Sequence, residues 1–492
     1  MKYILAVDQS TQGTKGLLFD GEGRMTARCD RSHRQIVNDR GWVEHDPDEI
    51  MANTISVCRD VIEKAGIDPS DVCAFGISNQ RETSLMWDRE TGRPVYHAIV
   101  WQCARAKEIC ARHEKAGEAE IIRRKTGLTL SPYFPASKLQ WLMENVPLCG
   151  ELASSGRLCA GTIDTWLIYN LTGRKAFKTD YSNASRTQLF NISSLSWDPD
   201  LLESFKIPKD AMAEVCMSDS VFGMTDVGGV LPEPVPICGV LGDSHAALFG
   251  QNCLKPGQIK ATYGTGSSVM MNIGEKPLLS NGGLVTSLAW GMNGQVDYVF
   301  EGNLNYTGAV ISWLKDNVRL IENAAETGGL AAEANPEDKT YFVPAFTGLG
   351  APYWDPEATG LFTGITRTTG KAELVKACLE CIAYQITDLV RLMRQESGRT
   401  ISEIHADGGP TVNPYLMQFQ ADQADAAILI PELQELSGMG AAYAAGISAG
   451  LYDKEGIFDH ISHTKYQPHM DKGRREALYR GWTEAVERTL KK

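Results

Sequence analysis

The stretch YILAVDQSTQGTKGLLFDGEGRMTARC, residues 3–29, decides the fold of this 492-residue chain. It reads as two apolar strands joined by a short polar turn, with a further hairpin at residues 20–23. A similar unit, QIKATYGTGSSVMMNIGEKP, occupies residues 258–277 and again has a strand, a turn of small residues and a strand. Two such hairpins, roughly 250 residues apart, predict a duplicated architecture with a boundary near residue 250.

Length and composition fit that interpretation. The chain is 43% hydrophobic and 22% charged, which is too apolar for a disordered protein, and its length suggests two or three domains, or two large α/β domains of about 250 residues each. Between the hairpins, a helix is expected to begin after Asp46, because Pro47 suits the first helical position and acidic residues follow. Residues 72–78, VCAFGIS, read as a buried strand.

The charge balance excludes several partners. The formal net charge is -13, so a clustered basic face for nucleic acid or a membrane surface is not expected. No run approaches the ~20 apolar residues that span a membrane, and the N-terminus lacks the pattern of a secretory signal. The 12 cysteines are scattered, which is typical of reduced thiols, and we expect a cytoplasmic protein. The pair Cys378 and Cys381 lies in a helical pattern and is interpreted as core.

Three turns of small residues are suited to phosphate binding. They are residues 9–14, residues 264–267 and residues 407–409, the last following a strand expected at 401–405. Backbone N–H groups at such turns approach phosphate closely. None has the P-loop or dinucleotide-binding glycine pattern. Each alone could be a plain turn, but together they could hold one nucleotide in a cleft between the two halves.

Six motifs carry a family resemblance that covers nearly the whole chain in order. They are DQSTQGTK (8–15), SNQRET (78–83), AIVWQCAR (98–105), GDSHAALFGQ (242–251), TYGTGSS (262–268) and DGGPTVNPYLMQFQ (407–420). The chain resembles the FGGY carbohydrate kinases, and among them most the glycerol kinases. The resemblance implies two actin-like (ribonuclease H-like, hexokinase/Hsp70/actin superfamily) α/β domains with a cleft between them. Residues 1–250 would hold the acceptor, the first phosphate turn and the catalytic Asp, and residues 251–492 the second phosphate turn and adenosine.

The same resemblance assigns the catalytic groups. Asp243 is implied as the general base, because an alcohol that attacks a γ-phosphoryl group must lose its proton. Asp8 is implied as the residue that orients Mg²⁺, a hard cation that prefers oxygen ligands. From the residues alone, Asp243 could equally cap a helix and Asp8 could begin a turn. The expected ligands are ATP, Mg²⁺ and a small polyol or sugar.

Acceptor binding is implied for Arg81, Glu82, Trp101, Tyr133, Asp243 and Ser244. Arg81 donates to hydroxyl oxygens and Glu82 accepts from hydroxyl hydrogens, so the pair could grip vicinal hydroxyls. Trp101 offers an apolar face and Tyr133 a hydroxyl group. The alternatives are a surface ion pair between Arg81 and Glu82 and a purely structural Trp101.

Nucleotide binding is implied for residues from all three turns and one further segment: Thr11, Gln12, Lys15, Gly264, Thr265, Gly308, Ser312, Gly409 and Asn413. Lys15 stands where glycerol kinases usually have Arg. A lysine can still neutralise a phosphate, but it cannot bind it through two N–H groups at once as the Arg guanidinium does. Ser312 replaces a family Gln, which puts an adenine contact there in doubt.

Two further departures concern the acceptor. Ser244 replaces a Gln of the family's GDQQ, and Ser268 replaces a Phe. Both changes leave a larger, more polar pocket. Glycerol, converted to glycerol 3-phosphate, is therefore weighed against a four- or five-carbon polyol or ketose such as erythritol, xylitol, erythrulose or xylulose. Residues 228–234, GGVLPEP, lack a cation, so inhibition by fructose 1,6-bisphosphate is not expected.

Other function classes are an actin- or Hsp70-like ATPase without an acceptor and a silent sugar sensor. The acceptor residues argue against the first, and Asp8 together with Asp243 argues against the second. Domain closure over both ligands is expected, because a kinase must exclude water. Dimers and tetramers are common in the family that the chain resembles, so a homodimer or homotetramer is expected.

Overall fold

The computed structural model describes residues 1–433 and 435–491. Its first half is built on a six-stranded sheet, and the central strands β1, β6 and β15 run parallel. β2 and β3 extend the sheet in antiparallel fashion from β1. In spatial order the strands are β14 (Gly223–Thr225), β15 (Val235–Gly242), β6 (Val72–Asn79), β1 (Tyr3–Gln9), β2 (Gly13–Phe19) and β3 (Met25–Ser32).

The second half is built on a seven-stranded sheet with the same core order. β16, β22 and β23 are parallel, and β17 and β19 extend the sheet in antiparallel fashion from β16. The predicted duplication is therefore confirmed. In spatial order the strands are β18 (Val285–Met292), β19 (Gln295–Leu304), β17 (Ser267–Gly274), β16 (Ile259–Tyr263), β22 (Glu403–Asp407), β23 (Ala427–Pro431) and β24 (His463–Tyr466).

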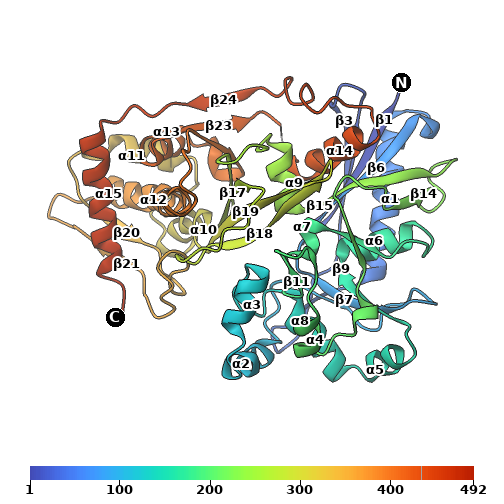
Figure 1. Cartoon of the computed structure of the whole chain (residues 1–492). Coiled ribbons are helices and arrows are strands. Elements are labelled where there is room, and N and C mark those ends of the chain that lie inside the picture. The colour runs from blue at the N-terminus through green and yellow to red at the C-terminus, as the bar shows by residue number, and fades with distance from the viewer. Residues whose placement is uncertain (434, 492) are drawn as a thin grey trace.

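A smaller five-stranded sheet and several helices form a lobe of the first half, beside its six-stranded sheet (Figure 1). Its strands are β4 (Ile36–Val37), β5 (Val43–His45), β8 (Ala98–Ile99), β7 (Ser84–Asp88) and β9 (Leu158–Thr162). The helices that follow β8 in the chain are α2 (Lys107–Lys115), α3 (Ala119–Thr126), α4 (Pro135–Asn145), α5 (Pro147–Ser154), α6 (Ile163–Leu171), α7 (Tyr181–Ala184) and α8 (Pro199–Ser204).

Local signals in the sequence set most element boundaries. The side chain of Asp46 caps α1 (Pro47–Ala65), as predicted. The strand expected at 401–405 is present but begins two residues later, as β22 (Glu403–Asp407). Its parallel pairing with β16 begins at Ile404, opposite Ile259. Cys378 and Cys381 are free and buried in α12 (Lys371–Ser397), which confirms their interpretation as core residues. Other helices of the second half are α10 (Gly308–Trp313), α11 (Glu326–Glu333), α13 (Pro414–Ala424) and α15 (Lys472–Glu487).

The order of the parallel strands brings the three turns together. β1, β6 and β15 end on one edge of the first sheet, and the helix that follows β15 is α9 (Asp243–Gly250). β16 and β22 end on the corresponding edge of the second sheet. Ligands of open α/β sheets bind outside the carboxyl ends of the strands. The turns and Asp243 therefore face a shared region.

One helix from late in the chain packs on the first half. α14 (Leu436–Ser448) lies against α9 and strands β1, β6 and β15 (Figure 1). The contact is close because glycines face it: a Cβ on Gly440 would lie 1.8 Å from the Ala246 carbonyl oxygen, and one on Gly76 would lie 2.7 Å from that of Ala441. The division of the chain at residue 250 stays a prediction. α14 comes after residue 250 in the chain but packs on elements that come before it.

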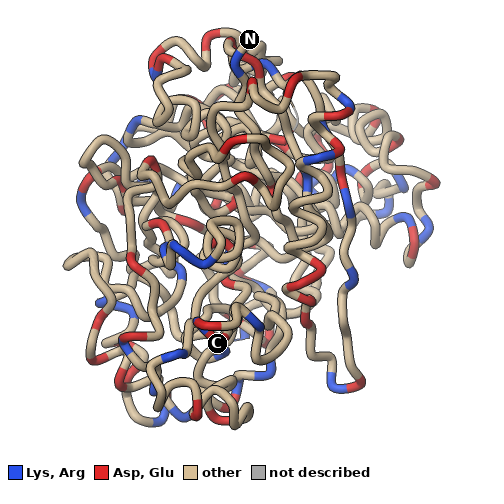
Figure 2. The backbone as a smooth tube through the Cα atoms, turned by 90° about the vertical axis from the view of Figure 1, so that its right-hand side faces the viewer, with Lys and Arg blue, Asp and Glu red and all other residues tan. Residues whose placement is uncertain are grey.

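Positive and negative residues are intermixed along the backbone (Figure 2). Among residues 1–433 and 435–491, each helix is too short or too polar to cross a membrane.

Gly440→Ala should lower the melting temperature. The new methyl group would press on the backbone of α9, and such overpacking typically costs about 1–3 kcal/mol. Gly150→Ala in α5 is a matched control, because its Cβ would meet nothing within 4 Å; replacing a helical glycine there should stabilise by roughly 0.5–1 kcal/mol. Thermal unfolding of both variants checks this, and equal melting temperatures would contradict the close packing.

Candidate active site

A cavity of about 640 Å³ lies where the two sheets meet. It is bordered by Asp8 and Asp243 from the first half and by Asp407 and Gly408 from the second. Two cations, Lys15 and Lys260, also line it. Residues from distant parts of the chain therefore share one chamber that contains several charged side chains.

Asp243 occupies the first position of α9, directly after β15. The cap residue of the helix is Gly242, so the alternative interpretation of Asp243 as the N-cap is wrong by one position. Asp243 Oδ1 accepts a hydrogen bond of 2.6 Å from the Ser244 backbone N–H. The side chain is 35% exposed, and this exposure leaves it open to the cavity. A carboxylate in this position can accept a proton from a ligand.

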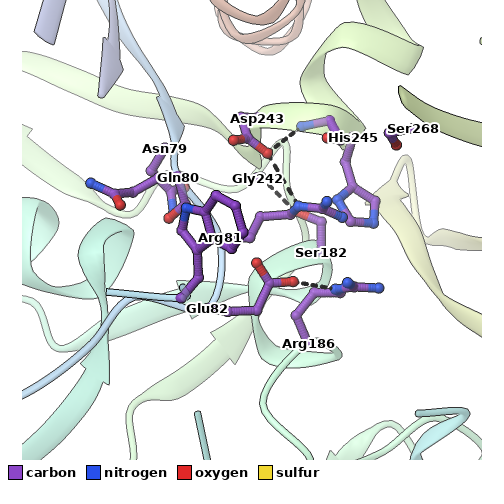
Figure 3. A network of polar contacts seen from close by, with 12 residues as sticks. Asn79, Gln80, Arg81, Glu82, Ser182, Arg186, Gly242, Asp243, His245 and Ser268 are labelled. Carbon is purple, nitrogen blue, oxygen red and sulfur yellow. Dashed lines mark hydrogen bonds and ion pairs between the residues drawn. The ribbon is translucent and has the colours of Figure 1, made fainter. Parts of the chain in front are cut away.

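Arg81 contacts Asp243 (Figure 3) and also joins it to the second half of the chain. Its Nε lies 3.1 Å from Asp243 Oδ1, and its terminal nitrogens donate to both oxygens of Glu301 on β19 at 3.2 and 2.9 Å. Arg81 and Glu301 are both buried. Burial alone would raise the pKa of Glu301, but the charges of Arg186 and Arg81 outweigh it and hold the pKa well below its ordinary value.

Glu82 is buried beside Arg186 rather than paired with Arg81. Glu82 Oε1 accepts a hydrogen bond of 2.6 Å from Arg186 Nε, and Arg186 Nη1 lies 2.7 Å from Glu301. The alternative of a surface ion pair between Arg81 and Glu82 is therefore wrong. Burial raises the pKa of Glu82, and the charges of Arg186 and Arg81 only partly offset it.

Trp101 and Tyr133 pack against each other. Their ring centroids are 5.4 Å apart, and both side chains are half-buried. Trp101 Nε1 donates a 2.9 Å hydrogen bond to Thr11 Oγ1. The wall expected for the acceptor is thus tied directly to the first phosphate turn.

A second, larger cavity of about 910 Å³ lies within the second half. All six nucleotide-binding residues predicted in that half line it: Gly264, Thr265, Gly308, Ser312, Gly409 and Asn413. Asn413 also caps α13 by accepting from the Leu416 N–H. Gly409 and Val412 border both this cavity and the smaller one, so the two chambers adjoin at the third turn.

The residues predicted at the first turn border a third cavity, of about 480 Å³. Thr11, Gln12 and Lys15 line it together with Asp243. Lys15 Nζ is already engaged, because it lies 2.5 Å from Glu435 Oε2 and 3.5 Å from Asp8 Oδ2. A phosphate group at this turn would have to compete with those carboxylates.

Asp8 sits in the cavity as a buried carboxylate. Ser78 Oγ donates to it at 2.9 Å. Burial raises the pKa of Asp8, and the nearby charge of Lys15 only partly offsets this. Within the described ranges, no group of three or more His, Cys, Asp or Glu side chains is placed to hold a metal ion. A single carboxylate suits Mg²⁺, which usually keeps several waters and binds substrate phosphates as well.

Ser244 and Ser268 both line the 640 Å³ cavity. Ser268 Oγ lies 3.4 Å from Glu301 Oε1. Small hydroxyl side chains therefore border the same chamber as Asp243.

Sequence reasoning missed the residues that complete this site. Arg186 and Glu301 were not expected, although both are almost fully buried charges. Lys260 and Glu435 were missed as well. A charged residue inside an otherwise apolar strand, as at Lys260 and Glu301, is the signal that could have drawn attention to them.

Comparison with known proteins agrees with this arrangement. The family models for the N-terminal and C-terminal domains of the FGGY family of carbohydrate kinases match residues 3–250 and 259–449. Glycerol kinase 2 of Thermotoga maritima is 47% identical over all of this chain and 99% of that protein. A glycerol kinase of Caldanaerobacter subterraneus is 46% identical with the same coverage.

Solved structures show the same fold. The crystal structure of Plasmodium falciparum glycerol kinase with ADP has a TM-score of 0.95 at 34% identity, covering 100% of this chain and 99% of that one. A xylulose kinase of Lactobacillus acidophilus has a TM-score of 0.89 at 23% identity, covering 99% of this chain and 97% of that one. The expectation of two actin-like α/β domains is confirmed. The chain belongs to the FGGY family of carbohydrate kinases.

Proposed function

We propose that this protein is a glycerol kinase that transfers the γ-phosphoryl group of ATP to glycerol and forms glycerol 3-phosphate. The observation that carries the proposal is the chamber that Asp243 shares with the first and third turns, next to the Arg81 network. Full-length relatives at 43–47% identity that bear the name glycerol kinase support the choice of acceptor.

Asp243 acts as the general base. As the acceptor oxygen bonds to the γ-phosphorus, its proton passes to the Asp243 carboxylate, and the bond from γ-phosphorus to the bridging oxygen breaks to release ADP. Arg81 holds the carboxylate in place through its 3.1 Å contact. The Trp101 ring packs against the acceptor carbons, while the backbone N–H groups of the turns bind phosphate oxygens.

ATP and Mg²⁺ fit the residues present. The larger cavity has room for adenosine, and the adjoining chamber receives the phosphate chain. Asp8 would hold Mg²⁺, which supplies positive charge to the transferring phosphoryl group when bound. The proposed location is the cytoplasm, supported by the reduced cysteines. A homodimer or homotetramer is proposed from the habit of the family.

A second candidate acceptor is a four- or five-carbon polyol or ketose. Ser244 and Ser268 favour it, because both line the chamber of Asp243 and offer hydroxyl groups that a longer polyol could bond. Glycerol remains the first candidate because of the relatives' names. The actin- or Hsp70-like ATPase without an acceptor has no comparable support, since such a protein would not need Arg81, Glu82, Trp101 and Tyr133.

Asp243→Asn should reduce glycerol-dependent ADP release by about 10²–10⁴-fold, because the amide cannot accept the proton, although its oxygen can still accept from Arg81. Calorimetric titration should show ATP affinity within about twofold of the wild type. Asp226→Asn, at an exposed loop position, is the control and should behave as wild type. Turnover that persists in Asp243→Asn would rule out its role as base.

Steady-state kinetics with glycerol, erythritol, xylitol, erythrulose and xylulose should give the highest kcat/KM for glycerol, by at least about tenfold, a difference of roughly 1.4 kcal/mol in transition-state stabilisation. A longer acceptor in first place would select the second candidate. ADP release that does not depend on any acceptor would instead indicate an ATPase.

A further inference from the structure

Lys260 is a buried cation that the mechanism above leaves without a task. It lies on β16 and is 1% exposed. Its Nζ donates one hydrogen bond, of 2.9 Å, to Thr262 Oγ1. Within residues 1–433 and 435–491, no carboxylate oxygen lies within 4.0 Å of Lys260 Nζ, so Lys260 forms no ion pair there. An ammonium group has three donors, so two of them have no protein acceptor.

Such a group is costly to leave incomplete. A buried charge without a partner costs several kcal/mol, and proteins normally pair it or satisfy it by hydrogen bonds. Burial lowers the pKa of Lys260, and the charge of Asp407 only partly opposes this. An anion that enters from the cavity would complete the hydrogen bonding of Nζ and favour its charged form.

The position of Lys260 indicates which anion this is. Lys260 lines the 640 Å³ chamber together with Asp243, and that chamber adjoins the larger nucleotide cavity at Gly409 and Val412. A nucleotide that lies in the larger cavity therefore directs its phosphate chain past the third turn toward Asp243. The phosphate nearest to the general base is the γ-phosphoryl group.

The other cations near Asp243 are already paired. Lys15 lies 2.5 Å from Glu435 and 3.5 Å from Asp8. Arg81 is shared between Glu301 and Asp243. Of the two lysines that line the chamber, Lys260 is thus the one with its donors free for a ligand.

We propose that Lys260 is a catalytic residue whose ammonium group donates to the non-bridging oxygens of the γ-phosphoryl group during transfer. Charge on these oxygens must be stabilised in the transition state, and a preorganised cation in a water-poor site does so effectively. The proposal rests on the proposed kinase function and deepens it. The proposal also gives the two lysines different roles. Lys15 belongs to the first phosphate turn, and Lys260 binds the γ-phosphoryl group that is transferred.

The test compares ADP with a non-hydrolysable ATP analogue, β,γ-imido-ATP, by calorimetric titration in the presence of Mg²⁺. Lys260→Met should weaken binding of the analogue at least about tenfold and leave the affinity for ADP within about twofold of the wild type, because only the analogue carries a γ-phosphoryl group. Glycerol-dependent kcat should fall by at least about 10²-fold. Lys260→Gln removes the charge while keeping an amide for Thr262, so it carries the test if the Met variant does not fold.

Lys465→Met is the matched control, because Lys465 lies on β24 of the same sheet and pairs with Glu403 at the surface. It should bind both nucleotides as wild type does. Equal weakening of ADP and the analogue by the Lys260 variants would overturn the proposal and assign Lys260 a structural role, as would an unchanged kcat. If the wild type shows no acceptor-dependent turnover, the proposed function fails, but the comparison of the two nucleotides still decides the role of Lys260.

Discussion

Two arginines of the first half of the chain share one carboxylate of the second half, and this buried contact sets the geometry of the cleft. Arg81 and Arg186 both reach Glu301, which is fully buried on β19. Removing one partner of such a network leaves an uncompensated charge, which typically costs about 3–5 kcal/mol. The position of the two sheets relative to one another is therefore coupled to the charges that surround the acceptor.

Arg81 connects this buried contact to Asp243, the general base. Its guanidinium touches Glu301 with its terminal nitrogens and Asp243 with Nε. The orientation of the general base thus depends on a strand more than 50 residues further along the chain. The α9–α14 packing supports the helix that begins at Asp243. An acidic protein can bind polyanionic ATP under these conditions, since backbone donors and a few placed cations act locally.

Local patterns predicted a large part of this arrangement. The two hairpins gave the duplicated sheets, and the small-residue turns gave residues such as Gly264 and Gly409 that line one cavity. The partners of the charged residues could not be predicted in the same way. Arg81 and Glu301 are 220 residues apart, and their pairing follows only from the meeting of two sheets. Nor could residue type alone show that Lys15 is paired and Lys260 is not.

Phosphoryl transfer to glycerol is tested most directly by ³¹P NMR of the purified protein with ATP, Mg²⁺ and glycerol. We expect the γ-phosphate signal of ATP to disappear while signals of ADP and a phosphomonoester of glycerol grow in equal amounts. Growth of inorganic phosphate with glycerol unchanged would contradict this mechanism, because water rather than the alcohol beside Asp243 would then be the acceptor.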